Sequence, residues 1–321
     1  MLRYSIVVPA YNEEAVLEES YKRLTRVMKE MGEPYELIFV DDGSRDETAN
    51  IIKGFCEQDE CVRLVSFSRN FGHQAAVSAG IDFAQGQAVI LIDADLQDPP
   101  EVIPEMAKKW REGFDVVYGV REKRKGESVF KRVTAKLFYR FLAAQTEFKI
   151  PVDTGDFRLM DRKVCDVLKN LTEKNRYIRG LVSFAGFQQT GISYVREERF
   201  AGETKYPLKK MISFAADATT SFSKKPLKIA GYLGTGISIA SFIYLFVILY
   251  LKLFTDQTVS GWASSMCVTL LLNGVILVIL GIMGEYVGRI YDEVKNRPLY
   301  IVKEQKNFEE QEGENRGERK A

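Results

Sequence analysis

Short apolar runs alternate with stretches of helical periodicity along the first two-thirds of the chain. Glycine, proline, asparagine and aspartate bound the runs, as they bound β-strands. Between the runs, apolar residues recur three and four positions apart, the spacing of an amphipathic helix. This alternation predicts an α/β domain with a mostly parallel, Rossmann-like sheet covered by helices on both faces. The expected strands are 4–8, 36–40, 62–67, 88–92 and 115–118, and the expected helices are 13–31, 48–57, 74–84 and 101–112.

Two long uncharged stretches follow in the last third of the chain, Ile229–Leu251 and Gln257–Gly284. As a helix, the first would be about 34 Å long at about 1.5 Å per residue, enough to cross the bilayer core. Two buried core helices are the alternative, but a core helix rarely stays uncharged over such a length. The pattern therefore predicts a C-terminal hairpin of two transmembrane helices, at about 229–251 and 263–284.

The flanking charges indicate how such a hairpin would be oriented. Basic residues precede the first stretch and follow the second, whereas the connecting segment offers only Lys252, which Asp256 offsets. Because cytosolic flanks carry the excess of lysine and arginine, we expect the N-terminal domain and both termini in the cytosol. No secretory signal pattern opens the chain. The flanking basic residues are Lys224, Lys225, Lys228, Arg289, Lys295 and Arg297.

The expected domain boundaries follow from these patterns. Residues 1–205 form the α/β domain, including a basic amphipathic helix at about 126–147 that lies in the membrane interface or packs on the domain. Residues 206–228 form an interfacial helix or linker, and 229–285 hold the two spans. Residues 286–321 form a cytosolic tail, and its polar composition from Lys303 onward predicts a disordered end.

Composition excludes several classes of protein. Lysine plus arginine is 45 and aspartate plus glutamate is 44, so the net charge of +1 argues against a nucleic-acid binder. The 4 cysteines are scattered without a C-x-x-C pair, which argues against a zinc finger or a disulfide scaffold. Since His73 is the only histidine, a hydrolase built on a Ser-His or Cys-His pair would have to use it.

Acidic residues gather directly after the predicted strands. In a parallel sheet the carboxyl ends of the strands meet at one edge, where ligands bind at the switch point of the strand order. Some of these side chains suit helix caps, but five together would repel one another, so a cation or sugar and ribose hydroxyls are the expected partners. No G-x-G-x-x-G or P-loop motif occurs, which disfavours nicotinamide, flavin and P-loop enzymes. The five are Glu13, Asp41, Asp42, Asp93 and Asp95.

The Asp93-Ala94-Asp95 sequence is the sharpest candidate for metal binding. It leaves a buried strand, with Gln97 as a third oxygen ligand and Pro99-Pro100 stiffening the exit. Such oxygen ligands suit Mg²⁺ or Mn²⁺, which share their coordination sphere with a substrate diphosphate. A capping turn before the following helix is the alternative.

In these and other motifs the chain resembles the family 2 GT-A glycosyltransferases. The resemblance lies in IVVPAYNEE, FVDDGSRDET, FSRNFGHQAA, LIDADLQDPPE and DTGDFRLMDRK, and it covers about residues 4–205. With the hairpin it is similar to the polyisoprenyl-phosphate group, which includes dolichyl-phosphate mannose synthase and the bactoprenol glucosyltransferases. The chain lacks the Q-x-x-R-W motif of processive polymer synthases. The resemblance implies a GT-A fold and inverting transfer of one sugar, UDP-glucose or UDP-N-acetylglucosamine being the expected donors, to undecaprenyl phosphate.

The resemblance also implies roles for individual residues. Asp156 and Asp95 would be the catalytic residues, Asp156 acting as a base or orienting the substrate. Asp93, Asp95 and Gln97 would hold Mg²⁺ or Mn²⁺, while His73 would support the donor loop or act directly. The donor would be bound by Pro9, Tyr11, Glu13, Val40, Asp42, Arg69 and Asp93, and the acceptor phosphate by Arg121, Arg132, Arg158, Arg199 and Lys205.

Two other functions compete with this one. One is a glycolipid synthase acting on a diacylglycerol-type hydroxyl, which would need a true general base. The other is a membrane-bound sugar-nucleotide sensor without turnover, which the intact carboxylate set disfavours. Sugar transfer to a polyprenyl phosphate implies a membrane as a partner. It also implies a flippase and an outer-face glycosyltransferase, which would use the product. A homo-oligomer is compatible with this function.

Overall fold

The structure is a computed structural model of the chain. It describes residues 2–122, 154–197, 225–254 and 261–308. The chain divides into two compact units. Among the described residues, the α/β unit comprises 2–122, 154–197 and 298–308, and the helical unit comprises 225–254 and 261–297.

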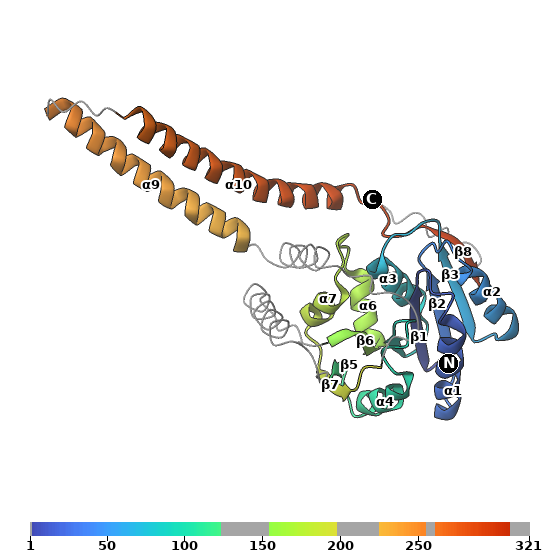
Figure 1. Ribbon diagram of the computed structural model, residues 1–321. Helices are drawn as coiled ribbons and strands as arrows, with labels where there is room; N and C mark the ends of the chain where they lie inside the picture. The colour runs from blue at the N-terminus through green and yellow to red at the C-terminus, as the bar shows by residue number, and fades with distance from the viewer. Residues whose placement is uncertain (1, 123–153, 198–224, 255–260, 309–321) are drawn as a thin grey trace. The chain divides into compact units, whose positions relative to one another are not determined.

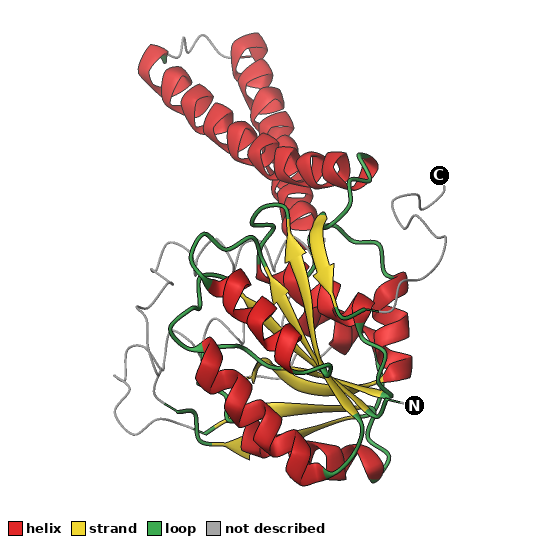
Figure 2. Cartoon of the chain, turned by 90° about the vertical axis from the view of Figure 1, so that its right-hand side faces the viewer, coloured by secondary structure: helices red, strands yellow, loops and turns green. Residues whose placement is uncertain are grey.

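An eight-stranded sheet forms the centre of the α/β unit (Figure 2). Its strands are β1 (Tyr4–Ala10), β2 (Tyr35–Asp41), β3 (Val62–Phe67), β4 (Ala88–Leu91), β5 (Val116–Arg121), β6 (Thr154–Asp161), β7 (Gln189–Tyr194) and β8 (Val302–Lys306). They lie in the order β7-β5-β6-β4-β1-β2-β3-β8. Strands β6 and β8 run antiparallel to their neighbours, and the other pairs are parallel.

Helices cover both faces of this sheet (Figure 1). They are α1 (Leu17–Met31), α2 (Thr48–Gln58), α3 (His73–Phe83), the 3₁₀ turn η1 (Pro100–Val102), α4 (Ile103–Arg111), α6 (Arg162–Asn170) and α7 (Ile178–Ala185). Helices α3, α6 and α7 contact one another, and α1 contacts α2 and α4. This layering explains why the central strands are apolar on both faces, since every position of β1 is buried.

The pattern of apolar residues predicts these elements well. Each of the five expected parallel strands is present within a few residues of its expected bounds, and so is each of the four expected helices. In α1, for example, Leu17, Leu24 and Met28 are buried at helical spacing, and the helix ends where Gly32 adopts a φ of 68°. The sheet also contains β6, an antiparallel strand between β4 and β5 that the alternating pattern does not predict.

Strand β8 corrects the expectation that the tail is disordered from Lys303. Residues 302–306 pair with the edge strand β3 in the antiparallel sense. Beside it, the Tyr300 hydroxyl donates to Asp82 at 2.9 Å, and its ring stacks on Phe67 at 5.0 Å between centroids. The segment is ordered although polar because it covers the open edge of the sheet, where alternate side chains face solvent.

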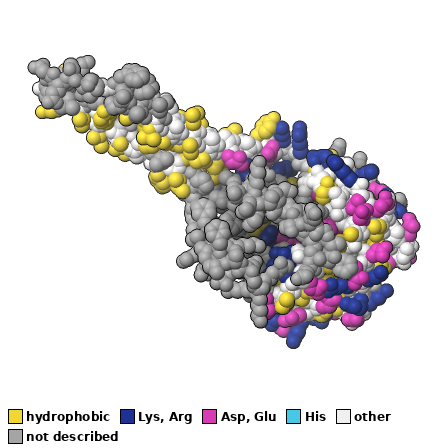
Figure 3. Space-filling view, in the orientation of Figure 1, with side chains coloured by type: hydrophobic (Ala, Val, Ile, Leu, Met, Phe, Trp, Pro, Cys, Tyr) yellow, Lys and Arg dark blue, Asp and Glu magenta, His cyan; other side chains and the backbone are white. Residues whose placement is uncertain are grey.

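The helical unit consists of α9 (Lys225–Phe254) and α10 (Trp262–Val294), which contact each other. Large apolar side chains are exposed along both helices (Figure 3). By length and composition, one stretch of the described residues, Leu271–Val294, is apolar enough to cross a membrane, with a mean hydropathy of 1.8. In α9 the apolar stretch Ile229–Tyr244 is shorter. This candidate stretch overlaps the second span expected at 263–284, and both expected spans remain proposals.

Candidate active site

The site lies at the carboxyl edge of the sheet, beside the switch point between β1 and β4. Strand β1 is flanked by β2 and by β4, so the strand order reverses there. Pro9 and Val40, both expected to contact the donor, are buried and lie opposite each other on β1 and β2. Tyr11 and Glu13 follow β1 and are partly exposed. The residues expected to bind the donor therefore approach this edge from two neighbouring strands.

Two of the five expected acidic residues are occupied by the protein itself. Asp41 accepts hydrogen bonds from the Ser44 amide at 2.9 Å and the Ser66 hydroxyl at 2.7 Å. Asp42 accepts from the Phe71 amide at 2.7 Å and the Gly72 amide at 2.9 Å. These bonds give both carboxylates a structural role, while their expected contact with a cation or a hydroxyl stays a prediction.

Asp42 acts on the site through the loop that it holds. Its bonds to the end of the β3–α3 connection fix the position of His73, the first residue of α3. Burial raises the pKa of Asp42, while the two amide bonds oppose the shift. Arg69 in the same loop is exposed, with its guanidinium 3.9 Å from the Phe71 ring centroid.

The Asp93–Gln97 loop follows β4. Leu96 has a φ of 58°, and the Gln97 amide donates to Asp95 Oδ1 at 3.1 Å. Burial raises the pKa of Asp93 to about 6. His73 opposes this shift, and the carboxylates of Asp156, Asp98 and Asp95 add to it. A divalent cation would relieve this crowding of negative charge.

These residues fit a magnesium or manganese ion. Among the residues that the structure describes, no group of three or more His, Cys, Asp or Glu side chains is arranged as a complete metal site. Mg²⁺, however, is commonly held by one or two carboxylates with substrate phosphates completing its shell. Asp93 and Asp95 supply that number of carboxylates. Gln97 is buried, at 8% exposure, so its amide is the least accessible of the three expected ligands.

Asp156 lies at the centre of a group of charged side chains. Its Oδ2 is 3.0 Å from His73 Nε2, and its Oδ1 is 3.0 Å from Arg179 Nε. The same His73 nitrogen is 3.8 Å from Asp93 Oδ1. His73, the first residue of α3, thus lies between the carboxylates of Asp93, which follows β4, and Asp156, which lies in β6.

The charge states of this group follow from the contacts. Burial alone would raise the pKa of Asp156, but Arg179 and His73 outweigh it and hold that pKa well below its usual range. Burial alone would lower the pKa of His73, but the hydrogen bond to Asp156 and the charges of Asp93 and Asp156 raise it to about 9. At neutral pH, Asp156 is therefore an ionised carboxylate between two cations.

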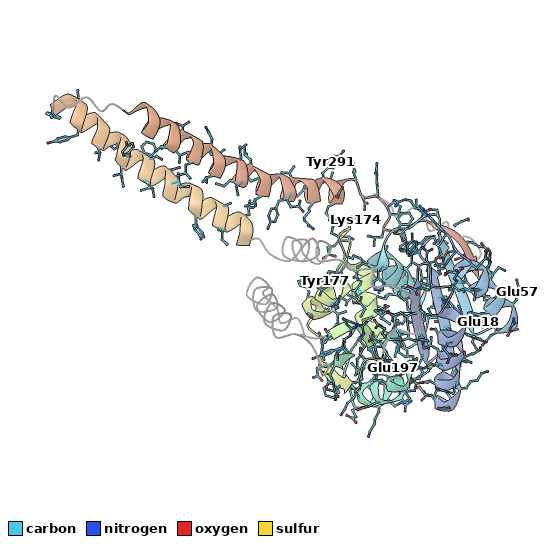
Figure 4. The ribbon with its side chains drawn as sticks, in the orientation of Figure 1. Glu18, Glu57, Lys174, Tyr177, Glu197 and Tyr291 are labelled. Atoms are coloured by element: carbon cyan, nitrogen blue, oxygen red, sulfur yellow. The ribbon has the colours of Figure 1, made fainter. Side chains whose placement is uncertain are left out.

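Arg179 was not predicted from the sequence. It lies in the first turn of α7, its guanidinium 5.2 Å from the ring centroid of Tyr177, which Figure 4 labels just before that helix. It also donates to the Thr154 carbonyl at 3.0 Å. No local motif surrounds it, so only its contacts with Asp156 and Thr154 in β6 reveal its role.

The expected acceptor arginines differ in position. Arg121 ends β5 and is partly exposed, 3.4 Å from Asp98. Arg158 is 4% exposed and donates to the Gly155 carbonyl at 2.9 Å, and burial lowers its pKa to about 10. Its guanidinium donates to the backbone of β6, which gives it a structural role there, and its expected phosphate contact stays a prediction. The other expected ligands, Arg132, Arg199 and Lys205, lie outside the described residues, as do the helix expected at 126–147 and residues 206–224.

This α/β fold, with paired aspartates after a central strand and Asp156 opposite them, agrees with a glycosyltransferase. The chain belongs to glycosyl transferase family 2, whose model matches residues 5–168.

Relatives match nearly the whole chain. It is 58% identical over 308 residues to an uncharacterized glycosyltransferase of Bacillus subtilis, YkcC, covering 96% of this chain and 95% of that protein. It is 42% identical over 304 residues to the SfII prophage-derived bactoprenol glucosyl transferase of Shigella flexneri, covering 94% and 98%. A similar solved structure is glucosyl-3-phosphoglycerate synthase from Mycobacterium tuberculosis in complex with Mn²⁺, UDP-glucose and phosphoglyceric acid. It is 21% identical and has a TM-score of 0.44, and the match covers 68% of this chain and 78% of that one.

Proposed function

We propose that this enzyme transfers one sugar from a nucleotide sugar to a polyprenyl phosphate at the cytosolic face of a membrane. The observation that carries the proposal is the ionised Asp156, held between His73 and Arg179 and facing the Asp93 loop. The relatives named bactoprenol glucosyl transferase support the acceptor class, since they match this chain from the α/β unit through the helical unit.

The acceptor chemistry agrees with the charge of Asp156. A phosphate monoester has a second pKa of about 6, so at pH 7 it is mostly a dianion that can attack without losing a proton. One of its oxygens forms the bond to the anomeric carbon as the bond from that carbon to the diphosphate breaks, with inversion. Asp156 then orients the reacting groups. A diacylglycerol-type hydroxyl would need a base, and a carboxylate whose pKa is held so low is a poor one.

The donor is a nucleoside diphosphate sugar, UDP-glucose or UDP-N-acetylglucosamine before GDP-mannose. Asp93 and Asp95 would hold Mg²⁺ or Mn²⁺ with the diphosphate oxygens, where the ion would neutralise charge on the leaving group. The residues at the ends of β1 and β2, with Arg69, would hold the nucleoside. Asp42 contributes by fixing the loop that precedes α3.

The connectivity of the chain supports two membrane spans. Strand β8 follows α10 and pairs in the same sheet as β1 to β3, so the chain leaves the α/β unit before α9 and returns to it after α10. A chain that starts and ends on one side of a membrane crosses it an even number of times. If Leu271–Val294 crosses, α9 is the described helix that supplies the second crossing. The basic flanks support a cytosolic position for the α/β unit.

A panel of radiolabelled nucleotide sugars tests the proposal. Membranes containing the full chain are incubated with each donor and polyprenyl phosphate, and label in the lipid fraction is counted. We expect one donor to label a lipid that forms only with added polyprenyl phosphate. Nucleotide-sugar binding without transfer from any donor would refute the proposal and favour a sensor.

A further inference from the structure

Asp98 is a buried carboxylate that three side chains share. It lies just after the Asp93–Gln97 loop and is 0% exposed. Its Oδ2 is 3.4 Å from Arg121 Nη2, and its Oδ1 is 3.6 Å from Arg196 Nε. The Tyr194 hydroxyl donates to the same Oδ1. One carboxylate therefore holds two guanidinium groups.

The strands bring these groups together at one edge. Arg121 and Tyr194 are the last residues of β5 and β7, and they lie opposite each other in that parallel pair. Arg121 Nε donates to the Tyr194 hydroxyl at 3.3 Å. The Glu197 amide donates to the Gln97 carbonyl at 3.0 Å, which closes the end of β7 onto the loop. The two arginines are thus fixed beside the carboxyl edge that holds the site.

Arg121 also reaches the neighbourhood of Asp156. Its guanidinium lies against Gly155 so closely that a Cβ at that position would collide with it. Gly155 directly precedes Asp156 in β6. The contact places Arg121 at the same end of β6 as Asp156, while its ion pair is with Asp98.

Within ion-pair distance, the two guanidinium groups share the single carboxylate of Asp98. The carboxylates of Asp93 and Asp95 act on them from farther away. The Nε of Arg196 is buried and has no hydrogen-bond partner among the described residues. Burial first, and then the charge of Arg121, lower the pKa of Arg196. The side chains of Arg121 and Arg196 are 29% and 25% exposed, so an anion can reach them from solvent.

We propose that Arg121 and Arg196, positioned by Asp98, form a binding site for a phosphate group of a substrate. This rests on the proposed function, and it adds Arg196 as a phosphate ligand and Asp98 as a positioning residue. Paired guanidinium groups suit phosphate, because each offers several N–H donors in a planar fork. The phosphate belongs to the acceptor lipid or to the donor diphosphate, and the two sources give different results below.

Arg196→Gln tests the site in the full-length enzyme. We expect it to raise the KM for one phosphate-bearing substrate by about 10-fold or more, with a smaller loss in kcat. The KM of Arg196→Lys for the same substrate should lie between those of Arg196→Gln and the wild type. The matched control is Glu197→Gln (Glu197 is labelled in Figure 4), because the Glu197 side chain pairs with Arg23 at 2.8 Å. The control is expected to keep both KM values.

The source of the phosphate follows from two measurements. A raised KM for undecaprenyl phosphate with unchanged binding of UDP and GDP, measured by calorimetry, assigns the site to the acceptor. Weakened nucleotide binding assigns it to the donor diphosphate. Unchanged KM and nucleotide binding in folded Arg196→Gln would overturn the proposal. If the wild type transfers no sugar, the proposed function fails first, and the calorimetry still tests the site.

Asp98→Asn tests the positioning role separately. If Asp98 fixes the two guanidinium groups, the variant loses affinity for the same substrate as Arg196→Gln, and the double variant loses little more. If Asp98 only neutralises charge, its removal leaves a more positive site that binds the phosphate more tightly. Tighter binding would therefore overturn the positioning role.

Discussion

At the scale of single residues, the contacts of Asp156 decide the kind of chemistry that the site performs. A carboxylate paired with Arg179 and His73 stays ionised throughout the physiological range. It can attract and orient cations and hydroxyls, but it binds a proton weakly. The pairing therefore favours an acceptor that arrives already ionised.

Replacing Asp156 by asparagine removes this charge and leaves the size of the side chain unchanged. We expect kcat to fall by about 10²-fold, while its pH profile keeps the rise near pH 6 that the acceptor phosphate sets. The measurement is kcat against pH for both enzymes. If added formate restored the activity of the variant while its donor affinity stayed intact, Asp156 would be identified as a base instead.

His73 makes the stability of the fold depend on pH in a definite direction. Its folded pKa of about 9 is above the value of about 6.5 expected in the unfolded chain. Its stabilisation is therefore complete below pH about 6.5 and is lost as the pH rises through about 9. We expect the difference in Tm between the wild type and His73→Gln, measured in EDTA, to shrink between these pH values. A difference that stays constant would show that the pair with Asp156 does not set the charge of His73.

At the scale of elements, β8 supports the loop that leads into the site. The Ser68 amide donates to the Ile301 carbonyl at 3.0 Å, and Phe67 lies between the rings of Tyr300 and Phe71. Asn307 donates to the carbonyls of Cys56 and Val62 at 2.8 and 2.9 Å. The segment after α10 thus backs the β3–α3 loop and holds it in place.

Tyr300→Ala removes the ring stack and the bond to Asp82. We expect the free energy of unfolding to fall by about 1–3 kcal/mol and the KM for the donor to rise, because the β3–α3 loop loses its support. Lys303→Ala, an exposed position on β8, is the matched control and is expected to change neither. Unfolding by urea and donor kinetics provide the two readouts. A donor KM unchanged in Tyr300→Ala would confine the role of β8 to stability.

The elements differ in how far local sequence predicts them. Parallel strands buried on both faces are continuous apolar runs, and Asp93 and Asp95 stand directly after one of them. The direction of β6 is set by its neighbours and not by its own residues. Strand β8 is polar, since it lies at an edge, and so its composition predicts a disordered tail instead of a strand. Arg179 and Asp98 have no local signature because their partners are far away in the sequence.

At the scale of the whole molecule, the return of the chain to the sheet constrains its path. Because β8 belongs to the same sheet as β1, we propose that the start of α9 and the end of α10 lie on the same side of the membrane that the helical unit would span. This proposal rests on the return of the chain to the sheet after α10. It agrees with the basic residues found on both outer flanks of the hairpin.

Cysteine labelling tests this path in intact cells. In a variant whose four native cysteines are replaced, a cysteine at Ser260 is expected to react with an impermeant thiol reagent from outside. A cysteine at Glu57, an exposed residue of α2, is expected to react only after the cells are opened. Labelling of both positions from outside, or of neither, would contradict a two-span protein with a cytosolic site.

The measurement that tests the central claim most directly is the mass of the lipid product. Purified full-length enzyme is incubated with its nucleotide sugar, undecaprenyl phosphate and Mg²⁺ or Mn²⁺, and the lipids are analysed by mass spectrometry. We expect the lipid phosphate to gain a single sugar. No product should form in EDTA, and Asp95→Asn should form at least about 10²-fold less product than the wild type. A product that carries several sugars, a glycosylated diacylglycerol, or full activity in EDTA would contradict the account.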